Sequence, residues 1–174
     1  MGFDPKTMNT TALAYIGDAV YEIYVRERVL AASGQLGRPQ LQSSTQEQGS
    51  PRQAHGTGKE QTAFGAHVDA LHKHAIRYVR AAGQAKALRA MLKDGFLTAE
   101  EEALVRRARN HKSASKPKNA DAMDYKYATA LEALIGYWHL TAARAGNTAE
   151  DAAEARKRME EIICRAFAEI ETMR

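Results

Sequence analysis

The stretch ALAYIGDAVYE at residues 12–22 decides the fold, because it predicts a helix that is apolar on two sides. It lies inside an expected helix over residues 10–32, with Asn9 or Thr10 as the N-terminal cap. When the helix is turned by about 100° per residue, one arc carries residues at core spacing: Leu13, Ile16, Val20, Ile23 and Tyr24. The opposite arc, usually polar in a surface helix, carries Ala14, Asp18, Tyr21 and Val25. We therefore expect a helix buried on both sides, with the Asp18 carboxylate in the middle of the second apolar face.

A second helix, expected over residues 120–143, places another acid in similar surroundings. Its apolar arc contains Tyr127, Ala130, Leu134, Tyr137 and Trp138. Glu132 lies on the other side, and the small residues Ala128 and Gly136, one turn before and after it, allow another helix to approach closely. A buried carboxylate is costly unless a cation or hydrogen bonds compensate it. Two such helices together predict an oxygen-ligand site for Mg²⁺ or Mn²⁺. A solvated or ion-paired surface acid is the plainer alternative, and spacing alone does not pair the two helices.

The rest of the 174-residue chain is also helical in character, rich in Ala, Leu, Glu and Arg, with only four prolines. Because no period-2 strand pattern is present, we expect an all-α fold and a single domain over residues 1–174. Further helices are predicted over residues 66–92 with a break near Gly83, over residues 98–110 behind a capping box at Thr98, and over residues 148–172. Residues 33–65 are rich in Gln, Ser, Gly and Thr and poor in large apolar residues, which predicts a mobile insertion.

Three features indicate a cytoplasmic protein without membrane contact. No run approaches the apolar length that a membrane span needs. The first nine residues lack the apolar stretch of a signal peptide. The single cysteine, Cys164, excludes an internal disulfide and suits a reducing compartment. On its own helix, Cys164 is expected to be a small core residue.

Positive charge is unevenly distributed along the chain. The net charge of +4 does not identify a nucleic-acid binder by itself. Between residues 106 and 118, however, there are six cations and no acid: Arg106, Arg107, Arg109, Lys112, Lys116 and Lys118. A basic loop that carries serines and Pro117 suits the phosphates and 2′-hydroxyls of RNA, although a solvated charge run is the alternative. For the cations of the helix over residues 66–92, RNA contact and plain solvation both stay open: Lys73, Arg77, Arg80, Lys86 and Arg89.

Four stretches in order resemble the ribonuclease III family, and most closely its short bacterial branch, the Mini-ribonuclease III family. The first is residues 12–22, and the last is ALEALIGYWHL at residues 130–140. Between them, the branch's Leu-His…Tyr-Val segment appears as Leu71-His72 and Tyr78-Val79. Its Arg-Asn-x-Lys-Ser…Pro-Lys-Asn-x-Asp stretch appears at residues 109–113 and 117–121. The resemblance covers residues 9–140 apart from the insertion at 33–65.

The resemblance implies a ribonuclease III catalytic domain, a dimeric helical bundle without a separate double-stranded RNA-binding domain. Asp18 and Glu132 would be its catalytic, metal-binding acids, with Mg²⁺ as the cofactor and Mn²⁺ as a substitute. Full-length ribonuclease III has two further acids, at the positions that hold Ala14 and Thr129 here, and the Mini branch shares this departure. Water and RNA phosphate oxygens would then complete the coordination, as Mg²⁺ tolerates. The number of ions per site stays open.

By the same resemblance, the function is endonucleolytic cleavage of double-stranded RNA to 5′-phosphate and 3′-hydroxyl ends by a homodimer, in maturation of the 23S ribosomal RNA precursor. The expected RNA contacts are Arg107, Arg109, Asn110, Lys112, Ser113, Lys118 and Asn119. Two alternatives remain. A non-catalytic ribonuclease III-like binder of structured RNA or ribosomal particles is favoured by the missing acids at positions 14 and 129. A helical scaffold for protein partners would show no RNA affinity that salt could weaken.

Overall fold

A computed structural model describes residues 3–33, 59–111, 121–144, 146 and 148–172 of the chain. The described residues form α-helices and one short 3-10 helix, with no strand among them, so the expected all-α class is confirmed. In chain order the elements are η1 (Pro5–Thr7), α1 (Thr10–Ala32), α2 (Lys59–Val79), α3 (Ala81–Lys93), α4 (Ala99–Asn110), α5 (Ala122–Ala143) and α6 (Ala149–Glu171). None of the described helices combines the length and the apolar character that crossing a bilayer requires.

Side-chain caps fix where the helices begin. Asn9 Oδ1 accepts a hydrogen bond from the Thr11 N–H at 2.8 Å, which confirms the predicted start of α1. The Thr98 hydroxyl accepts from the Glu101 N–H, and the Glu101 carboxylate accepts from the Thr98 N–H, so the predicted capping box of α4 is present. Thr148 and Asp151 form the same arrangement at the start of α6. After α3, Gly95 takes the left-handed conformation (φ 64°) that ends a helix with little strain.

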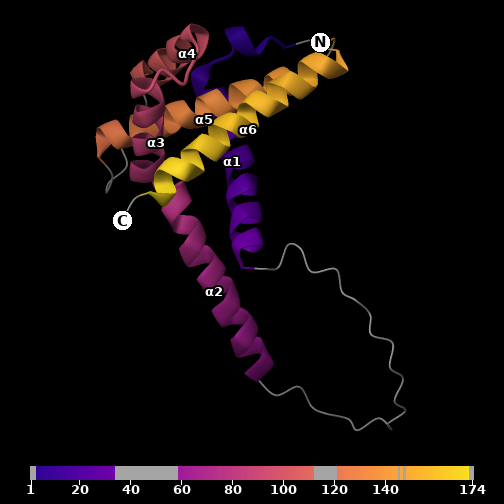
Figure 1. Ribbon diagram of the computed structural model, residues 1–174, viewed down its shortest axis with the longest axis vertical. Coiled ribbons are helices and arrows are strands. Elements are labelled where there is room, and N and C mark those ends of the chain that lie inside the picture. Colours follow the sequence, from indigo (N-terminus) through magenta and orange to yellow (C-terminus); the bar gives the residue numbers. More distant parts are fainter. Residues whose placement is uncertain (1–2, 34–58, 112–120, 145, 147, 173–174) are drawn as a thin grey trace.

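Helix α5 lies at the centre of the fold and packs against α1, α3, α4 and α6 (Figure 1). Its Leu131, Leu134 and Ile135 are completely buried. Burial of such side chains contributes about 1.5–3 kcal/mol each, which explains why α5 is apolar on nearly every side. Helix α2 extends away from this body, beside the end of α1 (Figure 1).

Two glycines let the backbones of α1 and α5 touch. A Cβ added to Gly17 would overlap the backbone carbonyl of Glu132, and a Cβ added to Gly136 would overlap the backbone carbonyl of Leu13. The prediction that small residues beside Glu132 admit another helix is therefore confirmed at Gly136, and α1 is the helix that approaches.

The predicted helix over residues 66–92 is two helices, and its details differ from the expectation. Helix α2 begins at Lys59, so the predicted start of this helix at residue 66 is wrong, and the earlier start follows the helix-favouring sequence Lys-Glu-Gln. Residues 34–58 of the predicted insertion lie outside the described residues. The break falls at Arg80, whose backbone is extended (ψ 133°). Gly83 serves packing instead, because a Cβ there would lie 3.1 Å from the Arg77 carbonyl oxygen and 3.5 Å from the Ile170 side chain.

Two expected core residues are on the surface. Ile23 is 56% exposed, although Leu13 and Val20 on the same predicted arc are buried. Cys164 is exposed as well. The buried stripe of α6 includes Ile162, Ile163 and Ala166 and passes beside position 164.

Candidate active site

The contact between α1 and α5 brings the two predicted acids together from distant parts of the chain. Gly17 touches the backbone of Glu132, and Asp18 is the next residue on α1. Electrostatics also show the proximity: burial is the main cause of the raised pKa of Glu132, and the charge of Asp18 adds to it. The structure therefore pairs the two helices, which spacing alone left unpaired.

The two carboxylates differ in burial. Ala14 and Tyr21, on the same arc as Asp18, are 5% and 1% exposed, so the prediction of a second buried face on α1 is confirmed. The Asp18 residue itself is exposed, and the prediction of a buried carboxylate at this position is wrong. The contact with α5 is centred on Gly17, so Asp18 emerges at its edge. Glu132 is the recessed member of the pair.

Burial and mutual repulsion both oppose ionisation of the pair. Burial, with the charge of Asp18 as the second cause, raises the pKa of Glu132 to about 8. Although Asp18 is largely exposed, partial burial of its carboxylate raises its pKa, and the charge of Glu22 adds to that effect. The more exposed Asp18 loses its proton first, while Glu132 is still neutral, and its charge then opposes ionisation of Glu132.

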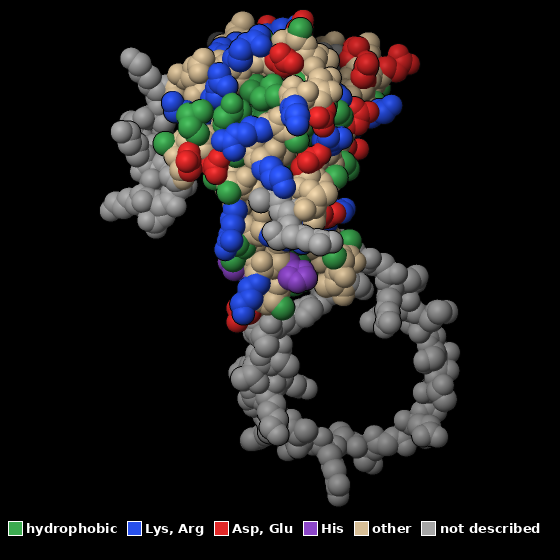
Figure 2. Space-filling model, turned by 60° about the vertical axis from the view of Figure 1, so that its left-hand side comes forward, with side chains coloured by type: hydrophobic (Ala, Val, Ile, Leu, Met, Phe, Trp, Pro, Cys, Tyr) green, Lys and Arg blue, Asp and Glu red, His purple; other side chains and the backbone are tan. Residues whose placement is uncertain are grey.

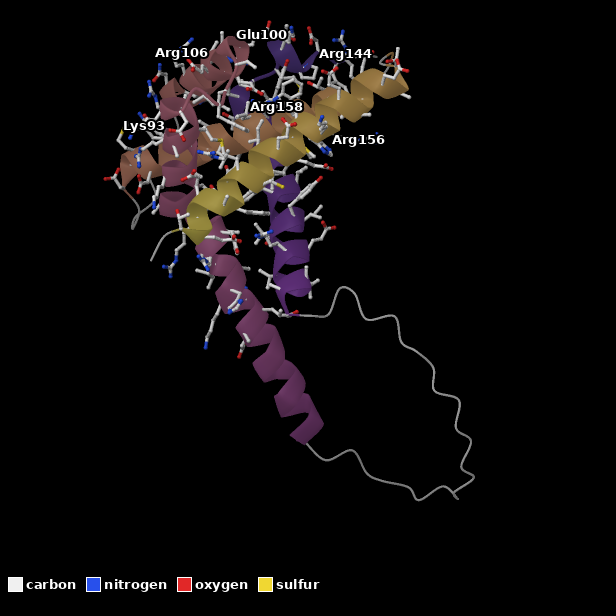
Figure 3. The ribbon with its side chains drawn as sticks, viewed as in Figure 1. Lys93, Glu100, Arg106, Arg144, Arg156 and Arg158 are labelled. Atoms are coloured by element: carbon white, nitrogen blue, oxygen red, sulfur yellow. The ribbon has the colours of Figure 1, made fainter. Side chains whose placement is uncertain are left out.

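A second acid, Glu101, is buried with hydrogen bonds and an ion pair that compensate the charge of its carboxylate. It is 2% exposed. Arg158, which lies on α6 (Figure 3), donates to both carboxylate oxygens of Glu101, at 2.9 and 2.8 Å. Trp138 Nε1 and the Thr98 N–H donate to it as well, each at 2.8 Å. Burial raises the pKa of Glu101, but the hydrogen bonds from Arg158 and Thr98 outweigh it, so the pKa is lowered. Within the described residues, Glu132 and Asp18 have no such hydrogen-bond or ion-pair partner.

This donor set fits a divalent cation of the Mg²⁺ type. Two adjacent carboxylates with no protein counter-charge in the described part of the chain are the oxygen ligands that Mg²⁺ accepts. The described residues contain no group of three or more His, Cys, Asp or Glu side chains placed to hold a metal. Mg²⁺ usually keeps several waters and uses only one or two carboxylates, so a pair of acids suffices.

Other polar residues near the pair have separate roles. Glu22 is exposed and pairs with Arg26 at 2.6 Å. His139 lines a groove with Val20 and Tyr24. Tyr21, which the sequence marked only as apolar, donates its hydroxyl to the Tyr78 carbonyl at 3.3 Å and so ties α1 to the end of α2. Burial is the main cause of the raised pKa of Tyr21, and the charge of Glu132 adds to it, so Tyr21 lies near this acid.

Three of the predicted RNA contacts lie on the last turn of α4. Arg107 is exposed, and its Nη1 donates to the Lys6 carbonyl at 3.3 Å. Asn110 is exposed. Arg109 is half-buried and donates to the Tyr127 hydroxyl at 3.0 Å. Arg106, on the outer side of α4 (Figure 3), pairs with Glu102. The remaining predicted contacts lie outside the described residues: Lys112, Ser113, Lys118 and Asn119.

Further cations spread over one face of the molecule. Figure 2 shows Lys and Arg side chains across the body and continuing down onto α2. Among the cations of α2 and α3, Arg77 donates to the Ile170 and Glu171 carbonyls at the end of α6, and Arg89 pairs with Asp124 at 2.8 Å. Lys73 and Lys86 are exposed, with no ion pair to any described residue. The structure thus assigns packing roles to Arg77 and Arg89, while RNA contact by the two lysines stays a prediction.

Comparison with known proteins gives a consistent set of relatives. A model of the ribonuclease III domain matches residues 58–143. The chain is 39% identical to a Mini-ribonuclease 3 of Enterococcus faecalis, over 79% of this chain and 81% of the relative. It is 37% identical to one of Symbiobacterium thermophilum, over 79% and 80%, and 34% identical to one of Brevibacillus brevis, over 97% and 92%. A crystal structure of a Fusobacterium nucleatum protein shares the fold, with a TM-score of 0.58, 23% identity and 93% of each chain covered.

Proposed function

Since this chain belongs to the Mini-ribonuclease 3 family, we propose that it is an endoribonuclease that hydrolyses double-stranded RNA with Mg²⁺, or Mn²⁺ in its place. The observation that carries the proposal is the meeting of Asp18 and Glu132 where α1 touches α5, with no compensating group among the described residues. The products are 5′-phosphate and 3′-hydroxyl ends.

The two acids would hold the ion from different positions. Glu132 is recessed, and its backbone is held against Gly17, so its position is set by the helix contact and not by a flexible loop. Asp18 stands at the exposed edge of the same contact, where a phosphate of a bound duplex can reach. A bound divalent cation lowers the pKa of a coordinated water and offsets the charge that develops on the phosphate. Ala14 and Thr129 supply no carboxylate, which leaves coordination positions for water and for the RNA itself.

The RNA is held by the basic end of α4 and the residues that follow it. Arg107 and Asn110 are exposed there. In sequence they continue into Lys112, Ser113, Lys118 and Asn119, whose charges and donors suit phosphates and 2′-hydroxyls. Contacts of this kind recognise the shape of a duplex more than its sequence.

Two finer parts of the proposal rest on the family resemblance. The active form is a homodimer in which each protomer cuts one strand of the duplex. The physiological substrate is the precursor of the large-subunit (23S) ribosomal RNA.

A cleavage assay on a simple RNA duplex tests the proposal. Wild type should cut in Mg²⁺ and stop when EDTA is added, and Asp18→Asn and Glu132→Gln should both abolish cleavage while duplex binding persists. Glu22→Gln is the matched control, because it removes an exposed acid one turn from Asp18 that already pairs with Arg26. Wild-type rates in either acid variant would contradict the assigned roles. Binding without cleavage at any Mg²⁺ or Mn²⁺ concentration would favour the alternative, a non-catalytic binder of structured RNA.

A further inference from the structure

Tyr127 on α5 contacts two guanidinium groups from different helices. The Cζ atom of Arg89, on α3, lies 4.4 Å from the centre of the Tyr127 ring, and that of Arg109, on α4, lies 5.5 Å from it. The Tyr127 hydroxyl also accepts the hydrogen bond from Arg109 at 3.0 Å. Asp124, one turn earlier on α5, pairs with Arg89 at 2.8 Å and offsets the repulsion between the two cations. One aromatic side chain therefore joins α3, α4 and α5.

This joint, formed by Tyr127 with Arg89, Arg109 and Asp124, connects the helix that carries the proposed RNA contacts with the helix that carries Glu132. Arg109 is in the last turn of α4, the turn that also carries Arg107 and Asn110. Tyr127 is on the same helix as Glu132. The joint therefore sets where the exposed RNA-contacting turn of α4 stands relative to the acid on α5.

Arg109 is more buried than Arg107 and makes more contacts with described side chains. Its guanidinium makes a cation–π contact with the Tyr127 ring and donates a hydrogen bond to the Tyr127 hydroxyl, and the residue is half-buried. Arg107 is exposed, and among the described residues its side chain makes a hydrogen bond to the Lys6 backbone carbonyl. A guanidinium that contacts a ring and donates to its hydroxyl at the same time is not readily replaced by lysine, whereas a cation that meets phosphate only as a charge is largely replaceable.

We propose that Arg109 and Tyr127 are positioning residues for RNA binding, holding the last turn of α4 against α5, and that Arg109 does not itself contact phosphate. This inference rests on the proposed function and refines it. The acids are positioned by a different contact, that of Gly17 with Glu132. Loss of the joint therefore weakens binding of the RNA duplex and leaves the cleavage step intact.

The test compares Arg109→Lys, Arg109→Ala and Tyr127→Leu with Arg107→Lys and Arg107→Ala. Steady-state cleavage of an RNA duplex gives kcat and KM, measured well below the melting temperature of each variant. Salt titration of duplex binding is done in an Asp18→Asn background, so that no cleavage interferes. Both Arg109 variants and Tyr127→Leu should raise KM roughly tenfold, as expected when ordering must accompany binding, with kcat within about twofold of wild type. Their salt slopes should match wild type.

The Arg107 pair supplies the contrasting result. Arg107→Ala should lower the slope of log Kd against log salt by about one, and Arg107→Lys should keep it. The double variant Arg109→Ala with Tyr127→Leu should bind no more weakly than either single variant, because both remove one joint.

Three outcomes would overturn the positioning role, and they are distinguishable. A salt slope lowered by about one in Arg109→Ala, with Arg109→Lys and Tyr127→Leu like wild type, would make Arg109 a direct phosphate contact. A fall in kcat at unchanged KM would make the joint merely structural. Absence of both binding and cleavage in the wild-type chain would instead overturn the proposed function on which the inference rests.

Discussion

Gly17 of α1 lies so close to the backbone carbonyl of Glu132 of α5 that a Cβ at position 17 would overlap it. Gly136 meets the Leu13 carbonyl in the same way, one turn along each helix. Because the facing atoms are backbone on both sides, no side-chain rotation can relieve an added atom. The distance between the two helices, and with it the placement of Asp18 beside Glu132, is therefore built into the fold.

Gly17→Ala should force α1 and α5 apart. We expect a loss of about 3 kcal/mol in the free energy of unfolding, the upper end of the usual range for overpacking. Cleavage per folded molecule should fall about a hundredfold, the effect of a displacement near 1 Å in a catalytic group. Urea denaturation and a duplex cleavage assay measure the two effects.

Gly95→Ala is the control for this substitution. Gly95 has φ 64°, and no described atom lies within 4 Å of an added Cβ. Alanine there should cost about 1–2 kcal/mol through backbone strain alone, without changing cleavage per folded molecule. Equal cleavage by Gly17→Ala and wild type would show that the helix contact does not set the site.

The raised pKa of Glu132 predicts how stability depends on pH in the metal-free protein. The folded state keeps the Glu132 proton up to about pH 8, while the unfolded chain releases it near its ordinary pKa. The unfolded state thus binds fewer protons within that window, and the free energy of unfolding should fall as pH rises, by up to about 5 kcal/mol. Chemical denaturation in EDTA at several pH values measures this slope.

Glu132→Gln should flatten that slope and should be more stable than wild type at pH 8. Glu22→Gln, which removes an exposed acid, should keep the wild-type slope. If Glu132→Gln and wild type fell in parallel with pH, the burial and repulsion assigned to Glu132 would be incorrect.

Arg158→Ala should be strongly destabilising. Its removal leaves the Glu101 carboxylate buried without its cation, which typically costs about 3–5 kcal/mol. Trp138, the one tryptophan of the chain, donates to Glu101 and provides a fluorescence signal for the unfolding transition. Arg26→Ala breaks an exposed pair with Glu22 and should cost under about 0.5 kcal/mol. Similar losses in the two variants would mean that the Glu101 network contributes little.

Local signals in the sequence were sufficient for most helix boundaries. Asn9 and Thr98 are capping residues, and their chemistry acts within one turn. The sequence predicts a break near Gly83, whereas the break between α2 and α3 occurs at Arg80. Gly83 is small because the Arg77 carbonyl and Ile170 approach it, and a residue on α6 is not visible to a local pattern.

The sequence indicates the two acids of the candidate site, Asp18 and Glu132, but it does not predict that Asp18 is exposed. Periodicity indicates the side of α1 that holds Asp18. Only the packing of α1 against α5 shows that the contact is centred on Gly17 and that Asp18 beside it stays exposed. Likewise, charge alone grouped Arg109 with Arg107. Their different surroundings come from Tyr127, which is distant in sequence from both.

Binding of Mn²⁺, followed by calorimetry or by electron paramagnetic resonance of the free ion, most directly tests whether Asp18 and Glu132 together hold a divalent cation. The wild-type protein should bind Mn²⁺ without RNA present, Asp18→Asn and Glu132→Gln should each lose that binding, and Glu22→Gln should retain it. Mn²⁺ affinity in the Asp18→Asn and Glu132→Gln variants equal to that of wild type would contradict the account.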